Sequence, residues 1–449
     1  MDKIDKLLEC QRTAFNNGEF SEIKGREQQL WRLFDVIKDN EAKIAAALHT
    51  DLGKSEFEAR ATEISIVLDE ISAMAKNLKH YARPEFVPTA IFNWPSSGQI
   101  LREPYGQVLI FSAWNYPFQL LMLPLLGAVA AGNCVVAKPA EQAPATAKVI
   151  EALLGQVFES KQVLTVQGGR ETAKELLKRR FDYIFYTGGE NGGKAMLRAA
   201  AEFLTPVTLE LGGKSPCIVD ADAKLDLSAK RIIWGKFLNA GQTCVAPDYL
   251  LVHKSLKPKL IERMNYWIKC FYGDNPLKSA DYPRIVNDHH VERLLKLYPN
   301  AVCDREKRYI APILIPEASA DDLVMKEEVF GPLLPILEFE QLTEAIKFIN
   351  ERPKPLALYY FGKSGLDQVL RTTSSGGVCV NDTVTHLVNP AMPFGGVGNS
   401  GIGAYHGKWS FELFSHLKPV MRKSTLVDLP MRYPPYSSGK LKMLKALTK

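Results

Sequence analysis

The feature that most constrains the fold is a regular alternation that begins at Gln107. The runs QVLIFSA, NCVVAKP, QVLTVQGG and FDYIFYTGG have the length and composition of buried strands, and stretches such as ETAKELLKRR between them have helical spacing. PVTLELGG and SPCIVD continue this pattern into a second region that ends near residue 385. Strands that alternate with helices favour a doubly wound parallel sheet, so we expect an α/β fold.

One stretch of this region resembles a membrane span. Between Pro104 and Ala137 the chain has no charged residue, and the run is long enough to cross a bilayer. Asn115, Pro117 and Gly132 interrupt it, however. We therefore predict a buried strand, a loop, an interior helix (FQLLMLPLLGAVAAG) and a second buried strand, with no membrane span.

The two ends of the chain have a different character. The first 80 residues show helical stripes, such as the one that Leu30, Leu33 and Ile37 form, and ARPEFVPTAIFNWPSSG then reads as an extended arm. The final KLKMLKALTK is too short and too charged to span a bilayer, and we expect an exposed helix there.

Composition limits the classes of function. A chain of 449 residues predicts two or three domains, and its mild net charge of +6, spread along the chain, disfavours nucleic acid as a partner. The seven cysteines are scattered without a CxxC spacing, which disfavours a disulfide framework and a metal site. The N-terminus lacks the apolar core of a secretory signal, so we expect a cytoplasmic protein.

The segment FDYIFYTGGENGGKA leads from a strand through glycines into a helix, whose free N–H groups and dipole suit a phosphate. It has the GxxxxGK part of a P-loop from Gly188 to Lys194, but Ala195 stands where a serine or threonine would hold magnesium. The match to a GxGxxG dinucleotide fingerprint is also imperfect. A glycine-rich turn without a ligand is an equal alternative.

Three polar residues stand out near strand ends. Cys244, in NAGQTCVAP, has small and turn-forming neighbours that are unusual for a core cysteine. Glu210 lies at the end of VTLELGG, where a partly desolvated carboxylate has a raised pKa and can act as a general base, although most single glutamates merely face solvent. Asn115 lies between two aromatic residues in FSAWNYP and can donate to an oxyanion or cap a turn. Together they suggest thiol chemistry on a carbonyl.

The chain resembles the aldehyde dehydrogenases, and most of all their class 3 or fatty-aldehyde branch. The matching segments are FSAWNYP, GNCVVAKPAE, TLELGGKSP, NAGQTCVAP, EEVFGP and PFGGVGNSGIGAYHGKWSF. The resemblance implies a Rossmann-type parallel-sheet cofactor domain, an α/β catalytic domain and a small oligomerisation arm. The implied divisions are 1–82 with 99–208 for the NAD(P)-binding domain, 209–385 for the catalytic domain, 83–98 with 386–430 for bridging segments, and 431–449 for the tail.

The resemblance also implies roles for individual residues. Cys244 would be the nucleophile, Asn115 would hold the oxyanion with the Cys244 N–H group, and Glu210 would activate the hydrolytic water. Tyr116 and Trp234 match aromatic positions of a substrate funnel for medium or long aliphatic, or aromatic, aldehydes. The implied cofactor-binding residues are Lys138, Glu141, Gly188, Gly193, Glu328 and Phe330.

The chain departs from the family pattern at one point, and two alternative functions stay open. Gly189 and Glu190 replace the usual small hydroxyl residues, and Glu190 would either repel a phosphate or stabilise the helix start. NAD is expected in preference to NADP because Glu141 can accept from a ribose 2′-hydroxyl. The expected assembly is a homodimer. An acylating, coenzyme A-dependent dehydrogenase and a non-catalytic relative are the alternatives.

Overall fold

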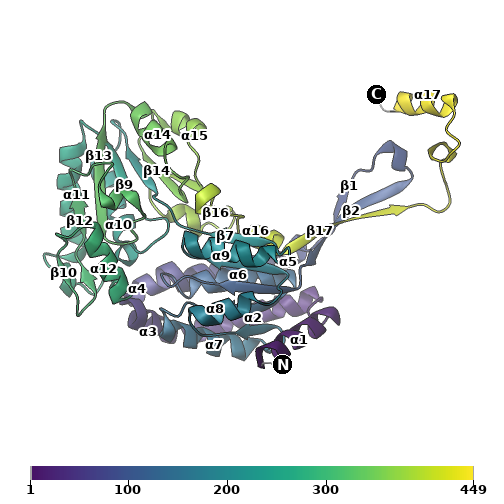
Figure 1. The fold of residues 1–449 in the computed structure, drawn as a ribbon, viewed down its shortest axis with the longest axis horizontal. Coiled ribbons are helices and arrows are strands. Elements are labelled where there is room, and N and C mark those ends of the chain that lie inside the picture. Colours follow the sequence, from purple (N-terminus) through teal and green to yellow (C-terminus); the bar gives the residue numbers. More distant parts are fainter. Residues whose placement is uncertain (1–2, 448–449) are drawn as a thin grey trace.

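Two six-stranded sheets organise the body of the molecule, and a three-stranded antiparallel sheet extends from it as an arm (Figure 1). The computed structural model describes residues 3–447. Parallel pairing dominates both large sheets, as the alternation of strands and helices predicts, and the α/β fold is confirmed.

The first sheet has the strand order β16-β7-β6-β3-β4-β5, and only the short β16 runs antiparallel to its neighbour. Most of the helices from the N-terminal third cover one face of it, whereas α1, α8 and α9 cover the other. The strands are β3 (Gln107–Phe111), β4 (Cys134–Lys138), β5 (Val163–Thr165), β6 (Tyr183–Thr187), β7 (Val207–Glu210) and β16 (Gly401–Ile402). The helices around it are α1 (Lys3–Asn16), α2 (Ile23–Asp39), α3 (Glu41–Leu52), α4 (Glu56–Ala59), the π-helix η1 (Arg60–Ile64), α5 (Ser65–Tyr81), α6 (Gln119–Ala131), α7 (Pro144–Val157), α8 (Arg170–Leu177), α9 (Glu190–Ala201) and α16 (Gly407–Leu413).

The uncharged run forms β3, a loop, α6 and β4, as expected. Every residue of α6 is buried, which explains why this helix shows no polar face. Gly127 allows α16 to approach α6, because a Cβ there would lie 2.6 Å from Cβ of Ser410. Among residues 3–447, no helix is both long and apolar enough to cross a membrane.

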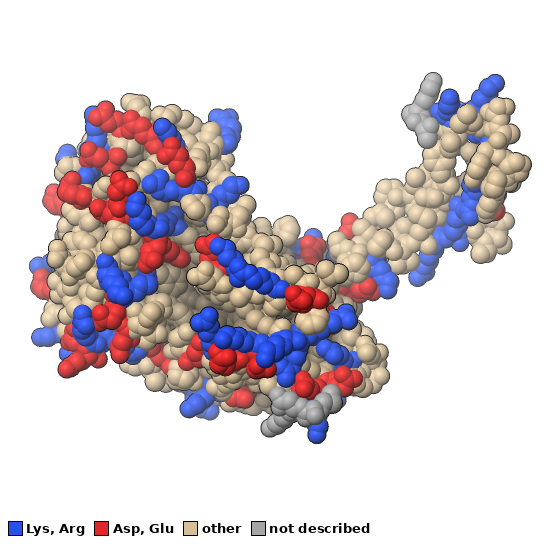
Figure 2. Space-filling model, in the orientation of Figure 1, with Lys and Arg blue, Asp and Glu red and all other residues tan. Residues whose placement is uncertain are grey.

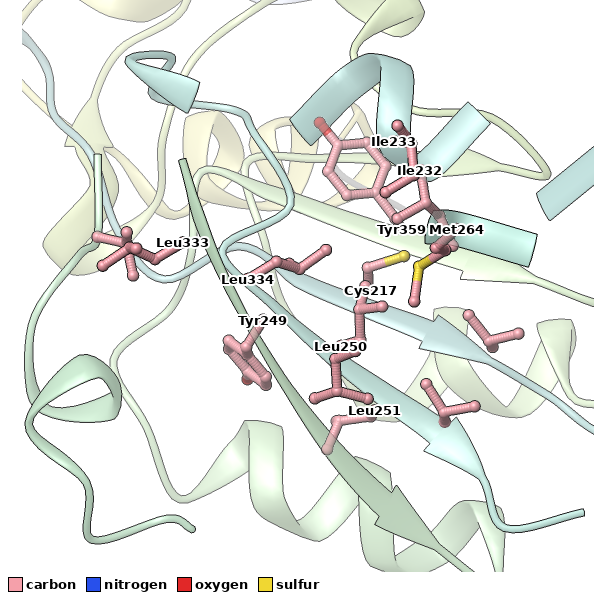
Figure 3. Packing of buried hydrophobic residues seen from close by; sticks show 14 of the residues in the cluster. Cys217, Ile232, Ile233, Tyr249, Leu250, Leu251, Met264, Leu333, Leu334 and Tyr359 are labelled. Atoms are coloured by element: carbon pink, nitrogen blue, oxygen red, sulfur yellow. The ribbon is translucent and has the colours of Figure 1, made fainter. Parts of the chain in front are cut away.

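The second sheet is parallel throughout, with the order β12-β13-β9-β8-β14-β15. Its core packs Cys217, Leu250 and Tyr359 against helix residues such as Ile233 on one face, whereas Tyr249 packs against Phe348 on the other (Figure 3). The strands are β8 (Pro216–Val219), β9 (Tyr249–His253), β12 (Ile313–Ile315), β13 (Leu333–Phe339), β14 (Ala357–Phe361) and β15 (Gly377–Val380), with the separate hairpin β10 (Cys303–Asp304) and β11 (Tyr309–Ile310). The helices are α10 (Leu225–Phe237), α11 (Lys257–Tyr272), α12 (Asp288–Leu297), α13 (Leu323–Lys326), α14 (Leu342–Asn350) and α15 (Leu366–Thr372).

The arm consists of β1 (Glu85–Val87), β2 (Ser96–Pro104) and β17 (Ser415–Lys423), and the helix α17 (Ser438–Leu447) lies at its tip (Figure 1). The extended arm and the exposed terminal helix agree with the sequence patterns. In Figure 2 the surface of the arm is mostly uncharged. Its exposed apolar side chains include Phe86, Trp94, Leu417 and Met421.

The strands refine two of the expected divisions. The boundary at residue 209 passes through β7, which belongs to the first sheet along its whole length. The segment expected to be a bridge, 386–430, contributes β16 to that same sheet and α16 to its helical cover before it enters the arm. The tail then begins beyond β17.

Substitution of Gly401 tests the packing of β16 on β7. Gly401 lies opposite Glu210, and a Cβ at this position would lie 2.3 Å from the Leu209 carbonyl oxygen. Because backbone atoms cannot yield cheaply, we expect Gly401→Ala to destabilise the protein by about 1–3 kcal/mol, measured as a lower apparent Tm. Gly25→Ala in α2 is the control, since its Cβ meets open space and alanine favours a helix by about 1 kcal/mol. Equal Tm values for the two variants would contradict this account.

Candidate active site

Cys244 follows a tight turn at the end of α10, in the loop that leads to β9. Asn239, Ala240 and Gly241 all have positive φ values, of 51°, 52° and 77°, so the chain reverses over three residues in the left-handed region. Gly241 is required here because a Cβ would lie 2.3 Å from the Gly331 carbonyl oxygen. Because of this close approach, the loop that carries Cys244 packs directly against residues 327–332.

Two cavities meet at Cys244. The larger, of about 600 Å³, lies between the two domains and is lined by Gly188 and Glu210 from one side and by Glu328 and Phe330 from the other. The smaller, of about 180 Å³, is walled mainly by apolar side chains. Leu120, Cys244, Phe394 and Tyr405 line both cavities. Ligands in the two cavities can therefore meet at the sulfur.

The thiol of Cys244 is held in its neutral form. Burial raises its pKa to about 12, and the nearby carboxylates of Glu328 and Glu210 act in the same direction. The backbone N–H groups of Cys244 and Val245 face the sulfur and partly offset this effect. Ionisation of the thiol at neutral pH therefore needs a further positive group or a proton acceptor.

Glu210 ends β7 at the wall of the larger cavity. Both carboxyl oxygens are buried, and neither has a hydrogen-bond partner among residues 3–447. This burial raises the pKa of Glu210 well above its ordinary value. A buried carboxyl group of this kind can take up or release a proton when water reaches it.

Asn115 lies in the loop between β3 and α6, and hydrogen bonds hold both ends of it. Its side-chain Nδ2 donates to the Gln242 carbonyl oxygen over 3.0 Å. Its own carbonyl oxygen accepts from Lys54 Nζ at 3.0 Å and from Asn239 Nδ2 at 2.8 Å. Asn115 lines the larger cavity, and its side-chain amide has a second N–H group besides the one bonded to Gln242.

The segment 327–332 forms the opposite wall and is fixed by buried polar contacts. Arg293 donates to the carbonyl oxygens of Glu328 and Val329, and Asp248 accepts from the Val329 N–H at 2.9 Å. Burial, followed by repulsion from Asp248, raises the pKa of Glu328 to about 8. Phe330 has φ +46° and packs edge-on to Trp114, with ring centroids 5.3 Å apart.

The glycine-rich segment after β6 lies at the start of α9. Gly188 lines the larger cavity. Gly193 instead packs against Leu211, since a Cβ added at Gly193 would lie 2.9 Å from Leu211 Cδ2. Glu190 lies in the first turn of α9 and pairs with Lys194 at 2.6 Å. Its charge is thereby partly compensated beside the cavity.

Lys138 and Glu141 lie at the end of β4, at the same edge of the first sheet but outside the walls of the larger cavity. Lys138 Nζ donates to the Gly168 carbonyl oxygen at 2.6 Å and to Glu141 at 3.3 Å. Lys138 is buried, while about two-fifths of the Glu141 side chain is exposed (43%). A ligand at this edge would meet the carboxylate of Glu141 first.

The two aromatic residues expected at a substrate funnel both line the smaller cavity. Tyr116 is buried and its hydroxyl shares a hydrogen bond of 2.7 Å with the Thr243 hydroxyl. Trp234 is exposed for 39% of its surface and lies at the rim. The walls of the cavity are mainly apolar, with polar side chains such as Gln119 and Thr243 among them.

Several residues of the site were not expected from the sequence. Trp114, His290, Arg293 and Tyr405 line the larger cavity, and Lys54, Glu58 and Glu63 lie buried behind the loops of Asn115 and Asn239. In the sequence, the only sign of Lys54, Glu58 and Glu63 is that they are charged residues in a region with the spacing of amphipathic helices. Within residues 3–447, no three His, Cys, Asp or Glu side chains are grouped to hold a metal ion.

The raised pKa of Cys244 predicts a steep pH dependence of alkylation. In protein without cofactor, the thiolate fraction should rise about tenfold per pH unit between pH 7 and 9, and the rate of Cys244 modification by iodoacetamide should follow it. Peptide mapping separates Cys244 from the exposed Cys10 and Cys270. A rate that levels off below pH 9 would mean that the thiol is already ionised there.

Comparison with known proteins places this geometry in a family. The family model described as "Aldehyde dehydrogenase family" matches residues 1–420. The chain is 46% identical to the 4,4'-diaponeurosporen-aldehyde dehydrogenase of Staphylococcus aureus over all of both chains, and 45% identical to the rat "Aldehyde dehydrogenase, dimeric NADP-preferring" over 97% and 98% of the two chains. The solved substrate-bound state of Staphylococcus aureus AldH superposes with a TM-score of 0.97 at 46% identity, over all of both chains. The chain therefore belongs to the aldehyde dehydrogenase family, whose members are oxidoreductases that act on aldehydes.

Proposed function

We propose that this aldehyde dehydrogenase converts medium- or long-chain, or aromatic, aldehydes to carboxylic acids through a thiohemiacetal and a thioester on Cys244. The observation that carries the proposal is the position of Cys244, which lines both the large cavity between the domains and the small apolar cavity. An aldehyde in the small cavity and a cofactor in the large one would meet at this sulfur.

The larger cavity fits NAD(P). It runs from the first turn of α9, whose backbone N–H groups suit a pyrophosphate, to the sulfur of Cys244. Gly212 keeps one wall open, since a Cβ there would lie 2.1 Å from Glu328 Oε2. In this proposal Gly188 and the more distant Gly193 belong to the pyrophosphate region, Glu328 and Phe330 hold the nicotinamide ribose and ring, and Lys138 and Glu141 hold the adenine ribose. When bound, NAD(P)⁺ supplies a hydride acceptor and a positive charge near the thiol.

The first chemical step joins the sulfur to the aldehyde carbon. Sγ of Cys244 forms a bond to this carbon, and the thiol proton is transferred to the site or to solvent. The negative charge that develops on the aldehyde oxygen is stabilised by Asn115 Nδ2 and the Cys244 N–H group, each worth about 3 kcal/mol. Loss of the aldehyde hydrogen as hydride, for which NAD(P)⁺ would be the acceptor, then converts this alkoxide to the thioester, so that one proton and one hydride leave in all.

The second step hydrolyses the thioester. Glu210 takes a proton from water, the resulting hydroxide attacks the thioester carbon, and the C–S bond breaks to release the carboxylic acid and restore the thiol. The raised pKa of the buried Glu210 supports this role, because it makes the carboxylate a stronger base than an exposed glutamate.

The small cavity supports an apolar substrate. Ile66, Leu238, Val245 and Leu387 are among its walls, and Tyr116 and Trp234 add aromatic surface. The hydroxyl of Tyr116 is already paired with Thr243, so the ring rather than the hydroxyl is available to the substrate. The Staphylococcus aureus relative, named for 4,4'-diaponeurosporen-aldehyde, is compatible with this class.

NAD is the proposed preferred cofactor, with NADP as a second one. The exposed carboxylate of Glu141 can accept a hydrogen bond from a ribose 2′-hydroxyl and would repel a 2′-phosphate, whereas its ion pair with Lys138 weakens that repulsion. The rat relative carries the name NADP-preferring, so both cofactors belong in every assay.

A homodimer in a reducing compartment such as the cytoplasm completes the proposal. The exposed apolar side chains of the arm and the free edges of its sheet supply a surface for a second copy. All seven cysteines are free, which fits a reducing environment.

Replacement of Cys244 tests the proposed function. An aldehyde panel from acetaldehyde to hexadecanal plus benzaldehyde, with NAD and NADP in parallel, should give NADH or NADPH with the wild-type protein. Cys244→Ser should reduce this turnover at least a thousandfold, because serine is a far weaker nucleophile at neutral pH. Cys10→Ser, at an exposed cysteine, is the matched control and should keep full activity. Near-normal turnover of Cys244→Ser would exclude the assigned nucleophile.

Replacement of Glu210 separates the two chemical steps. Glu210→Gln keeps the shape of the side chain but cannot take a proton from water. We expect a rapid burst of about one NADH per site, a slow steady state, and an acyl group that intact mass spectrometry detects on the protein. Loss of the burst itself would assign Glu210 to activation of the thiol, and unchanged turnover would remove it from the mechanism. Steady turnover restored by coenzyme A in place of water would favour the acylating alternative.

A further inference from the structure

An ion pair lies directly behind the loop that carries Asn115. Lys54 Nζ and Glu63 Oε1 are 2.6 Å apart, and both side chains have no exposed surface. Removal of two charges from water carries a large solvation penalty, and a well-packed apolar pair of the same volume is often at least as stable. Stability alone is therefore a poor explanation for a buried pair at this place.

Local backbone features direct the two side chains inward. Gly53 ends α3 with φ +69°, a left-handed C-cap, and the chain turns so that Lys54 enters the interior. Glu63 lies on the π-helix η1, between the α-helical segments α4 and α5. A π-helical turn shifts the register of a helix and is frequent at functional sites.

The Lys54–Glu63 pair contacts four residues of the loop that carries Asn115. Besides Glu63, Lys54 Nζ contacts the Asn115 carbonyl oxygen at 3.0 Å and the face of the Tyr116 ring, whose centroid is 3.9 Å away. These contacts account for all three N–H bonds of the ammonium group. Glu63 Oε2 accepts from the Phe118 and Gln119 N–H groups at 2.9 and 3.2 Å.

A second buried carboxylate connects the same loop to the cysteine loop. Glu58 Oε1 accepts from the Asn239 N–H at 2.9 Å, and Asn239 Nδ2 donates to the Asn115 carbonyl oxygen at 2.8 Å. The Asn115 carbonyl oxygen is thus the junction at which Lys54 and the residues before Cys244 meet. Loss of the Lys54 contact would leave this oxygen with a single donor among the described residues.

We propose that Lys54, fixed by Glu63, is a positioning residue that holds the Asn115 amide where it stabilises the oxyanion formed on attack by Cys244. The inference rests on the proposed function, in which Asn115 contacts that oxygen. Lys54 acts through the Asn115 backbone, from the side opposite to the substrate, and touches no reacting atom. Its Nζ contact with the Tyr116 ring also fixes one wall of the small cavity.

The test uses a double variant because a single one leaves a buried charge. Lys54→Met alone strands Glu63 and should lower Tm strongly. Lys54→Met/Glu63→Gln removes both charges and keeps an acceptor oxygen for the Phe118 and Gln119 N–H groups. Its Tm should recover most of the loss.

The main measurement is the burst of p-nitrophenolate from p-nitrophenyl acetate, which needs no cofactor. Sγ of Cys244 forms a bond to the ester carbon, the ester C–O bond breaks, p-nitrophenolate leaves with the electron pair, and the thiol proton goes to solvent. We expect the burst rate of the double variant to fall at least tenfold, while its Kd for NADH, from fluorescence, stays within twofold of wild type. A burst rate equal to that of wild type would overturn the inference.

A double-mutant cycle with Asn115 distinguishes positioning from a general structural effect. If Lys54 acts through Asn115, the double variant should lose no further burst rate in an Asn115→Ala background, whereas additive losses would overturn the proposal. Asp51→Ala is the matched control, because Asp51 is buried nearby but caps α7 through the Ala145 and Thr146 N–H groups. It should lower Tm without lowering the burst rate. A burst loss in Asp51→Ala equal to that of the double variant would also overturn the proposal.

Two different results would refute the proposed function and the inference about Lys54. Wild-type protein that gives the ester burst but no NADH with any aldehyde would refute the proposed function. Wild-type protein that oxidises aldehydes, with a double variant of unchanged burst rate, would refute the inference about Lys54 alone.

Discussion

Burial of carboxyl groups away from water is the constraint on which the arrangement of this site depends. Glu210 has no partner for either oxygen within the described chain, and burial raises the pKa values of Glu58 and Glu328 to about 7 and about 8. Glu58 and Glu328 can therefore exchange a proton near neutral pH, and burial also raises the pKa of Glu210 well above its ordinary value. The same burial raises the pKa of the Cys244 thiol to about 12, so the thiol is neutral at pH 7. The fully buried Lys54–Glu63 pair, by contrast, is an ion pair in the interior.

These groups meet because the carboxyl ends of strands of the first sheet face the amino ends of strands of the second sheet. β3, β4, β6 and β7 bring Asn115, Lys138, Gly188 and Glu210 to one edge of the first sheet, as parallel sheets do. The second sheet supplies the loops of Cys244 and Phe330. The contact between Gly241 and the Gly331 carbonyl oxygen joins these two loops into one wall. The large cavity is thus a property of the domain interface, whereas the small one lies behind it, among apolar side chains.

The sequence predicted the parts of the molecule that depend on local patterns. Short apolar runs identified β3, β4, β5, β6, β7 and β8, and interruptions such as Pro117 and Gly132 distinguished the buried helix α6 from a membrane span. Lys54 and Glu63 were not predicted because their role depends on contacts with residues 115–119, which lie 55 to 61 positions away in the hydrogen bonds Lys54–Asn115, Glu63–Phe118 and Glu63–Gln119. The shielding of the Tyr116 hydroxyl and the packing of Gly193 against Leu211 likewise follow from neighbouring elements, which no local pattern encodes.

The course of the chain after residue 400 has a mechanical consequence. Tyr405 and His406 are part of the wall of the small cavity, α16 follows at once and packs on α6, and β17 leaves from Ser415 to pair with β2 over nine residues. The arm and the cavity wall are thus joined by α16, which begins directly after His406 and is separated from β17 by Phe414 alone. A surface that binds the arm is therefore linked through α16 to the wall of the small cavity, although it does not itself contact the inside of that cavity.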